Sequence, residues 1–468
     1  MNQTLLSELE SVSLGDKRLN RRAIKIANSL LEKSTESFPN IFSASAELEA
    51  FYRFVESPYV NSDALLKPHI AASVQRSSNV GDIIIVHDTT EFVFSGKRDG
   101  LAPAEKYKST SYFAHASLAF RKDNTQPLGV LRMKTWVRNS PTKSALRRKG
   151  VPRKILQELP SEQDRWFESA RATAALFEQS DSLIHVCDSE GDDYTLLAKL
   201  KAESYRFVIR GCQNRKLVGS DEKLREILSS KPILAERVVP LSKRGSKDSS
   251  KKRLQARESR TANLEIRCAS ITVPRPYLPS KTLAETIDLN VVYVSEKDPP
   301  EGQQGVDWVL LTTEPISTIE EVTSIIDIYR TRWIIEEYFK VLKTGCSYES
   351  RQLDSYHTLL NCLALFVPIA WLMLSLRYSS RTTPNAPAES VLPGPLLEVL
   401  QLHTGKPVKT TEDTFLAIAR LGGHIKNNGA PGLLVLWRGF HELAVLTKGY
   451  LLATKEHSPL SRKRCDQS

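Results

Sequence analysis

The spacing of apolar and polar residues divides the chain into helical and strand-rich parts. Residues 1–75 have helical periodicity, with cations on one face that include Arg18, Arg22 and Lys25. From residue 80, short apolar runs typical of strands take over. These runs are residues 83–86, 111–120, 126–138, 183–187 and 206–210. Helical patterns at residues 161–179 and 194–201 complete an order that predicts a mixed sheet with helices packed on it.

Residues 211–315 interrupt this pattern. Four further strand-like runs surround a basic, Ser-rich stretch at residues 243–260, which is either a loop or an arm that touches DNA. We interpret the segment as a β-rich insertion.

The chain is predicted to be helical again after residue 350. The mostly apolar run 359–376 is long enough to cross a membrane, but Asn361 and Pro368 interrupt it, which favours a buried core helix. A Pro-rich linker follows at residues 379–395, with helices expected near residues 411–421 and 433–446. The tail from residue 458 is expected to be disordered.

Residues 327–345 carry the most informative pattern. Ser317 and Glu320 are spaced as a capping box that begins a helix, and Gly345 is placed to end it. On one continuous helix, apolar residues would occupy one face and polar residues the other. The polar face would hold Tyr329, Arg332, Glu336, Lys340 and Lys343. Such a face is often only solvated, with pairs four residues apart, but it would also suit a phosphate backbone beside a metal ion.

Composition narrows the class of partner. The chain of 468 residues is 41% hydrophobic and 25% charged, which is typical of a globular protein. Its formal charge of +11 favours a polyanionic partner, nucleic acid first. The six cysteines show no CxxC spacing and the start shows no signal peptide, so we expect neither a zinc site nor disulfides, and a cytoplasmic location without membrane attachment.

Two carboxylates are placed where open α/β sheets bind ligands. Asp88 and Asp188 each follow a buried apolar run, and on neighbouring strands they would lie side by side at the strand ends. Taken singly, either Asp could be only a turn former. With Glu336 as third ligand, the set would suit two Mg²⁺ or Mn²⁺ ions in phosphodiester chemistry. Arg332 and Lys343 could then hold phosphate oxygens, and Tyr329 could hydrogen-bond another.

The spacing Tyr329-x2-Arg332-x3-Glu336-x6-Lys343 resembles the YREK signature of bacterial insertion-sequence DDE transposases. The stretches 88–90 and 186–192 resemble the first and second Asp motifs of that family, although Ser189 stands where the family usually has Arg. The two ends of the chain are also similar to the N-terminal end-binding domain and the C-terminal dimerisation region of that family. The resemblance therefore covers nearly the whole chain.

This resemblance implies an α/β fold with an RNase H-like mixed sheet core, a β-rich insertion and helical N- and C-terminal domains. The implied domains are residues 1–75 (DNA end binding), 76–210 with 316–350 (catalytic core), 211–315 (insertion), 351–457 (dimerisation) and 458–468 (tail). The implied triad is Asp88, Asp188 and Glu336. The implied activity is cut-and-paste transposition through a DNA hairpin, by a homodimer that binds transposon ends and target DNA in the bacterial nucleoid.

The resemblance also implies DNA contacts outside the triad. Trp308 matches a residue that stacks on a flipped base, and Trp333 is a second candidate for that contact. Arg210 matches a DNA-contacting position after the fifth core strand, and Arg22 and Arg53 match end-binding positions. For Trp308 the alternative is a core aromatic, and for the arginines it is a plain surface cation.

Two other functions remain open from the residues. A metal-dependent nuclease without strand transfer could use the same core, and a non-catalytic regulator could keep end binding alone. The three acidic residues argue against the regulator, and the basic N-terminal and helical C-terminal regions argue against a simple nuclease.

Overall fold

The computed structural model divides into two compact units. The first contains Met1–Gly81, Thr89–Pro141 and Ile334–Ser468, and the second contains Asp82–Asp88 and Thr142–Trp333. The structure describes residues 8–33, 36–78, 80–104, 108–138, 143–152, 155, 162–241, 247–249, 252–254, 258–276, 282–392, 394–425 and 431–456. The predicted tail lies outside these ranges, as does much of the basic stretch 243–260.

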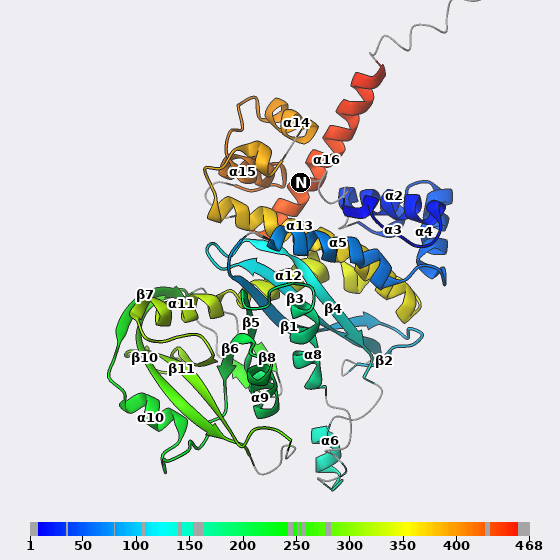
Figure 1. Ribbon diagram of the computed structural model, residues 1–468. Coiled ribbons are helices and arrows are strands. Elements are labelled where there is room, and N and C mark those ends of the chain that lie inside the picture. The colour runs from blue at the N-terminus through cyan, green and yellow to red at the C-terminus, as the bar shows by residue number, and fades with distance from the viewer. Residues whose placement is uncertain are drawn as a thin grey trace, which may run out of the picture. The chain divides into compact units, whose positions relative to one another are not determined.

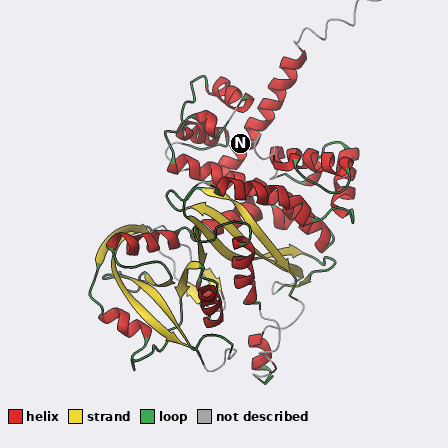
Figure 2. Ribbon diagram, in the orientation of Figure 1, coloured by secondary structure: helices red, strands yellow, loops and turns green. Residues whose placement is uncertain are grey.

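The second unit is built on a mixed sheet in the order β1-β5-β6-β12-β11-β10-β7. The strands are β1 (Ile83–Ser95), β5 (Leu183–Cys187), β6 (Arg206–Gly211), β12 (Asp307–Thr312), β11 (Thr286–Glu296), β10 (Arg260–Pro274) and β7 (Ala235–Leu241). The first three are parallel and the rest antiparallel. Figures 1 and 2 show β10 and β11 as long strands of this unit. The predicted insertion therefore continues the core sheet through the β6–β12 pair.

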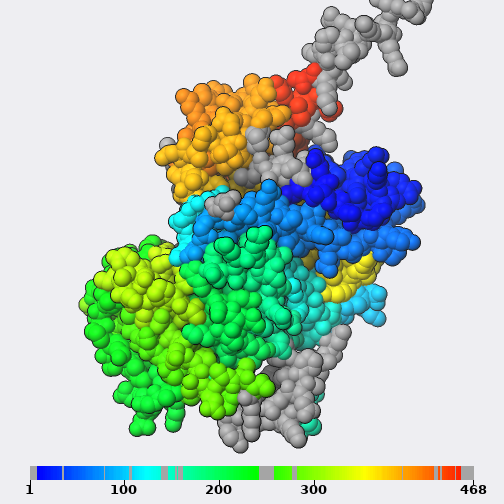
Figure 3. Space-filling view, in the orientation of Figure 1, coloured from blue at the N-terminus to red at the C-terminus, as the bar shows by residue number. Residues whose placement is uncertain are grey.

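Helices cover this sheet through an apolar core. They are α8 (Asp164–Ala174), α9 (Tyr194–Ala202), α10 (Leu224–Ser230) and α11 (Ile319–Arg330), and the short helix α6 (Lys143–Arg148) also belongs to this unit. Trp166 of α8, Leu197 of α9 and Leu228 of α10 join strand residues such as Phe207 and Val291 in one buried cluster. In the space-filling view the green and yellow-green residues of this unit form one continuous mass (Figure 3).

The first unit combines a hairpin with the helices of both chain ends. The hairpin strands β3 (Ser109–Arg121) and β4 (Pro127–Trp136) are antiparallel, as predicted, and β2 (Ala102–Pro103) pairs with β3. The N-terminal helices are α2 (Lys17–Lys33), α3 (Phe38–Ile41), α4 (Ser45–Glu56) and α5 (Ser62–Ser77). The C-terminal elements are α12 (Trp333–Lys340, from Ile334 on), a π-helical turn (Val341–Gly345), α13 (Tyr356–Thr382), α14 (Pro395–Thr404), α15 (Thr411–Leu421) and α16 (Leu433–Glu456).

Helix α13 is the core helix of the first unit. It is the one described helix long and apolar enough to cross a membrane, and 94% of its most apolar window is buried inside the protein. Asn361 interrupts the apolar run because its amide donates to the carbonyls of Val55 and Val60, at 2.9 and 3.1 Å. These bonds tie the N-terminal helices to α13, and the expectation of a buried core helix is confirmed.

Two predictions of element boundaries were wrong. β1 does not end at Val86, as the apolar run 83–86 predicted, but continues to Ser95, so Asp88 lies within the strand. Its pairing with β5 ends at His87, and β3 is its neighbour on the other side. The region treated as a linker ends in helix α14, which begins with Pro395 in its first turn, where proline fits a helix.

Together these elements form a mixed α/β fold with a large mixed sheet and helical N- and C-terminal regions. This is the architecture expected of an RNase H-like core with helical flanks.

Candidate active site

Asp188 lies at the carboxyl end of a completely buried strand. All five residues of β5 are buried, and Asp188 follows them as the cap of the short 3₁₀ turn Ser189–Gly191. Its carboxylate accepts a hydrogen bond from the backbone N–H of Glu190 at 2.8 Å. The chain can turn this sharply because residue 191 is glycine, since a Cβ there would lie 2.8 Å from the Cβ of Cys187.

The strand register brings Asp88 beside Asp188. β1 and β5 are parallel, and His87 pairs with Cys187, so the two aspartates come next on neighbouring strands about 5 Å apart. The pKa of the buried Cys187 thiol is affected by the charges of both carboxylates. Burial raises the pKa of Cys187 well above its usual value, and the charges of Asp188 and Asp88 raise it further. The side-by-side placement expected from the sequence is therefore present in the second unit.

Arg332 lies against this acidic pair. Its Nη1 is 3.6 Å from Oδ2 of Asp88, and its side chain is only 6% exposed. The guanidinium also lies over the ring of Trp333, 4.3 Å from its centre. Arg332 is therefore a buried cation with an acidic neighbour and an aromatic one.

Three more predicted residues belong to the same site. Tyr329 is buried, which raises its pKa, and the nearby cations Arg332 and Arg210 oppose that rise while Asp188 adds to it. The ring of Trp308 packs edge-on against Tyr329, with 5.6 Å between ring centres. The second unit thus gathers Asp88, Asp188, Arg210, Trp308, Tyr329, Arg332 and Trp333.

The prediction of one continuous helix through this stretch was wrong. Helix α11 is capped by Thr318 with Glu321, one residue later than predicted, and it ends at Arg330. Thr331 and Arg332 form a turn whose backbone N–H groups bond three residues back, and α12 begins at Trp333. The polar face expected of one continuous helix is therefore interrupted after Arg330, and Tyr329 and Arg332 are both buried.

Two predicted residues belong to the first unit. Glu336 is exposed on α12. Lys343 lies in the π-helical turn, where its ammonium donates to the carbonyl of Glu91 and lies 3.5 Å from the carboxylate of Glu349. Such turns are frequent at functional sites. The meeting of Glu336 with the two aspartates remains a prediction.

Sequence reasoning missed the residues that hold the Asp188 turn in place. The Asp192 carboxylate accepts hydrogen bonds from the backbone N–H groups of Cys212 and Gln213, at 2.6 and 2.8 Å, and pairs with Arg215 at 2.5 Å. Glu190 pairs with Arg165 of α8 at 2.7 Å. Asp192 could have been noticed within the motif, but nothing local marks its distant partners.

The comparisons with known proteins bear on this arrangement. Residues 1–60 match a family described as Transposase DNA-binding. Residues 83–365, more than half of the chain, match a family described as Transposase DDE domain.

The chain belongs to the DDE transposase family. It therefore binds DNA and is a DNA-cutting enzyme of transposition and recombination, and members of this family generally use divalent metal ions. Among solved structures, the piggyBac transposase synaptic complex with hairpin DNA is similar, at 10% sequence identity over 97% of this chain and 80% of that chain. The TM-score of 0.40 is too low for that likeness to carry an argument about this transposase.

The side chains of Asp88 and Asp188 are chemically suited to bind a divalent metal ion. Two adjacent carboxylates offer the hard oxygen ligands that Mg²⁺ and Mn²⁺ prefer. Across the described ranges, no three His, Cys, Asp or Glu side chains are grouped to hold an ion. Glu336 is the third ligand predicted from the sequence to join Asp88 and Asp188.

The two predicted end-binding arginines lie in the segment that matches the DNA-binding family. Arg22 is half-buried on α2, and Arg53 is exposed on α4, where it pairs with Glu49 one turn earlier.

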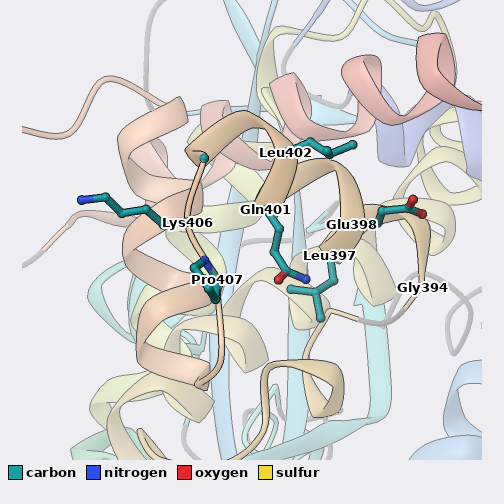
Figure 4. Close-up of a pocket in the computed structure, with 8 residues that line it drawn as sticks. Gly394, Leu397, Glu398, Gln401, Leu402, Lys406 and Pro407 are labelled. Atoms are coloured by element: carbon teal, nitrogen blue, oxygen red, sulfur yellow. The ribbon is translucent and has the colours of Figure 1, made fainter.

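An open hollow of about 590 Å³ lies on α14 and the loop after it (Figure 4). It is lined by Gly394, Leu397, Glu398, Gln401, Leu402, Gly405, Lys406 and Pro407. None of these is a predicted site residue, so the hollow is not a candidate active site.

Proposed function

We propose that this transposase excises and inserts a DNA element through Asp88, Asp188 and Glu336, with two Mg²⁺ or Mn²⁺ ions as cofactors. The observation that carries the proposal is the pair of aspartates on adjacent parallel strands, with the buried guanidinium of Arg332 against it. Bound divalent ions would supply an activated water and stabilise the leaving oxygen.

The chain's own residues would bind and orient the DNA. Arg332 donates to non-bridging oxygens of the phosphate that is cut, and Lys343 and Tyr329 bind further oxygens. Trp308 stacks on a base drawn out of the duplex, which allows the strand to bend sharply. Trp333, next to Arg332 in the chain, is the second candidate for this contact. Arg210, Arg22 and Arg53 contact the DNA of the transposon end.

The proposed reaction is a series of phosphoryl transfers. Water first cuts one strand at the end of the element and leaves a 3′-hydroxyl. That hydroxyl attacks a phosphorus on the opposite strand, a new P–O bond forms, and the bond to the flanking 3′-oxygen breaks, which closes a hairpin. A second water opens the hairpin, and the same 3′-hydroxyl attacks target DNA.

We also propose the division of labour along the chain. Residues 1–75 bind the ends, 76–210 with 316–350 carry the chemistry, 211–315 supply Trp308, and 351–457 form a homodimer. Such a dimer would bring two ends together. The YREK spacing supports a bacterial insertion sequence as the source and nucleoid DNA in the cytoplasm as the place of action.

The test is incubation of the protein with a duplex of its own terminal inverted repeat and Mg²⁺. We expect nicked and then hairpin products on a denaturing gel. Nicks without hairpins would indicate a nuclease that does not transfer strands, and a mobility shift without cleavage would indicate a DNA-binding regulator.

A further inference from the structure

The first two residues of β12 have a strand partner on one side only. Asp307 and Trp308 lie opposite Ser295 and Val294 of β11. On the other side, the register with β6 begins one residue later, at Val309 opposite Gly211. On the β6 side, the conformation at Trp308 therefore depends on contacts other than the sheet ladder.

Two arginines make contacts on that side. Nη1 of Arg225, the second residue of α10, lies 2.7 and 2.5 Å from the two carboxylate oxygens of Asp307. Nη2 of Arg210 donates to the backbone carbonyl of Asp307 at 3.5 Å. Both the side chain and the main chain of Asp307 are thus engaged, one residue before Trp308.

The loop that presents Arg225 is itself fixed at the active site. The backbone N–H of Arg225 donates to the side-chain oxygen of Asn214 at 2.9 Å. Directly before Asn214 in the same loop, the backbone N–H groups of Cys212 and Gln213 donate to Asp192, which follows the turn that carries Asp188. One short loop therefore joins the turn of a proposed catalytic carboxylate to the start of β12.

We infer that Arg225 and Asp307 are a positioning pair that sets the ring of Trp308 for base stacking. This inference rests on the proposed function. The pair is partly exposed, with 32% and 44% of the two side chains accessible, so it contributes little to folding. A stacking ring must instead be held in a defined plane when the base arrives, and the ring of Trp308 already packs against Tyr329 in the site.

The experiment compares two steps of one reaction. Arg225→Gln, Asp307→Asn and the double variant are each given the terminal-repeat duplex and Mg²⁺, and the rates of nicking and of hairpin closure are measured separately. 2-Aminopurine placed at positions next to the cut reports base unstacking. The matched control is Arg237→Gln, which breaks an ion pair with Asp327 in the same unit, at an equal arginine exposure of 32%.

We expect each single variant to nick within about twofold of the wild-type rate and to close hairpins roughly fivefold more slowly, the loss that a pair of this exposure can supply. The 2-aminopurine signal should fall in parallel. The double variant should be no slower than the slower single variant, because the two side chains act as one unit, and Arg237→Gln should leave both rates unchanged.

The inference is overturned if hairpin closure is unchanged in Arg225→Gln, or if nicking falls by the same factor. Independent, multiplied effects in the double variant would also overturn it. Failure of the proposed function looks different, because the wild type itself would then nick the duplex without closing hairpins.

Discussion

The buried pair of Asp192 and Arg215 should be worth several kcal/mol to the second unit. The Asp192 side chain is 0% exposed and that of Arg215 is 8% exposed, and their charged atoms lie 2.5 Å apart. Asp192→Ala would leave the guanidinium unpaired and would remove the acceptor of two backbone N–H groups. Breaking such a pair costs about 3–5 kcal/mol of the free energy of unfolding.

The melting temperature provides the assay. For a unit of this size, each kcal/mol shifts the midpoint by about 2–4 °C, so Asp192→Ala should lower it by about 10 °C in calorimetry. Removing the stranded charge as well, in Asp192→Ala with Arg215→Met, should recover much of the loss. The control is Asp164→Ala, which breaks an exposed pair with Lys199 and should cost less than about 1 kcal/mol.

Two results would refute this reasoning. The first is an Asp192→Ala variant that melts within about 2 °C of the wild type, a shift too small for a lost buried pair. The second is a double variant that is no more stable than the single one, because the cost would then not come from the unpaired Arg215.

Three further predictions follow from the site and the charge of the chain. Glu336→Ala should abolish cleavage of the terminal repeat but leave the mobility shift intact, and cleavage at the wild-type rate would exclude Glu336 from the triad. Burial lowers the pKa of His185 from 6.5 to about 4. Between these values the unfolded chain binds more protons, so stability should fall by roughly 3 kcal/mol as pH drops from 6.5 to 4. Urea unfolding at both pH values checks this, and His185→Gln should flatten the change. End affinity should fall steeply with added salt because counterions are released, and a flat titration would exclude a basic binding face.

The local sequence pattern was enough to place Asp188 at the end of a strand, but it was not enough to predict where β1 ends. The run 183–187 is apolar except for His185 and is followed by the polar Asp188, so the strand and its end were both visible. In β1, Asp88 follows a similar run, but Phe92 and Phe94 are buried and alternate with less buried neighbours. That alternation marks a strand covered on one face, and it could have extended the prediction.

The break in the signature helix had no local marker. Residues 319–340 contain neither proline nor glycine, so the helical periodicity continued through Thr331 without interruption. What ends α11 is tertiary, because Arg332 turns into the site toward Asp88. The partners of Asp192 were not predicted for the same reason. Arg215 is more than twenty residues away along the chain, and only the fold brings it near Asp192.

The antiparallel pairing of β6 with β12 also bears on how the insertion tolerates changes in length. Residues 212–308 begin after Gly211 and end before Val309, which are direct neighbours in the ladder. An excursion whose ends already touch can grow or shrink at a small entropic cost. A short reverse turn from Gly211 to Val309 would close the same ladder, so the β6–β12 pairing places no limit on the length of the segment between them.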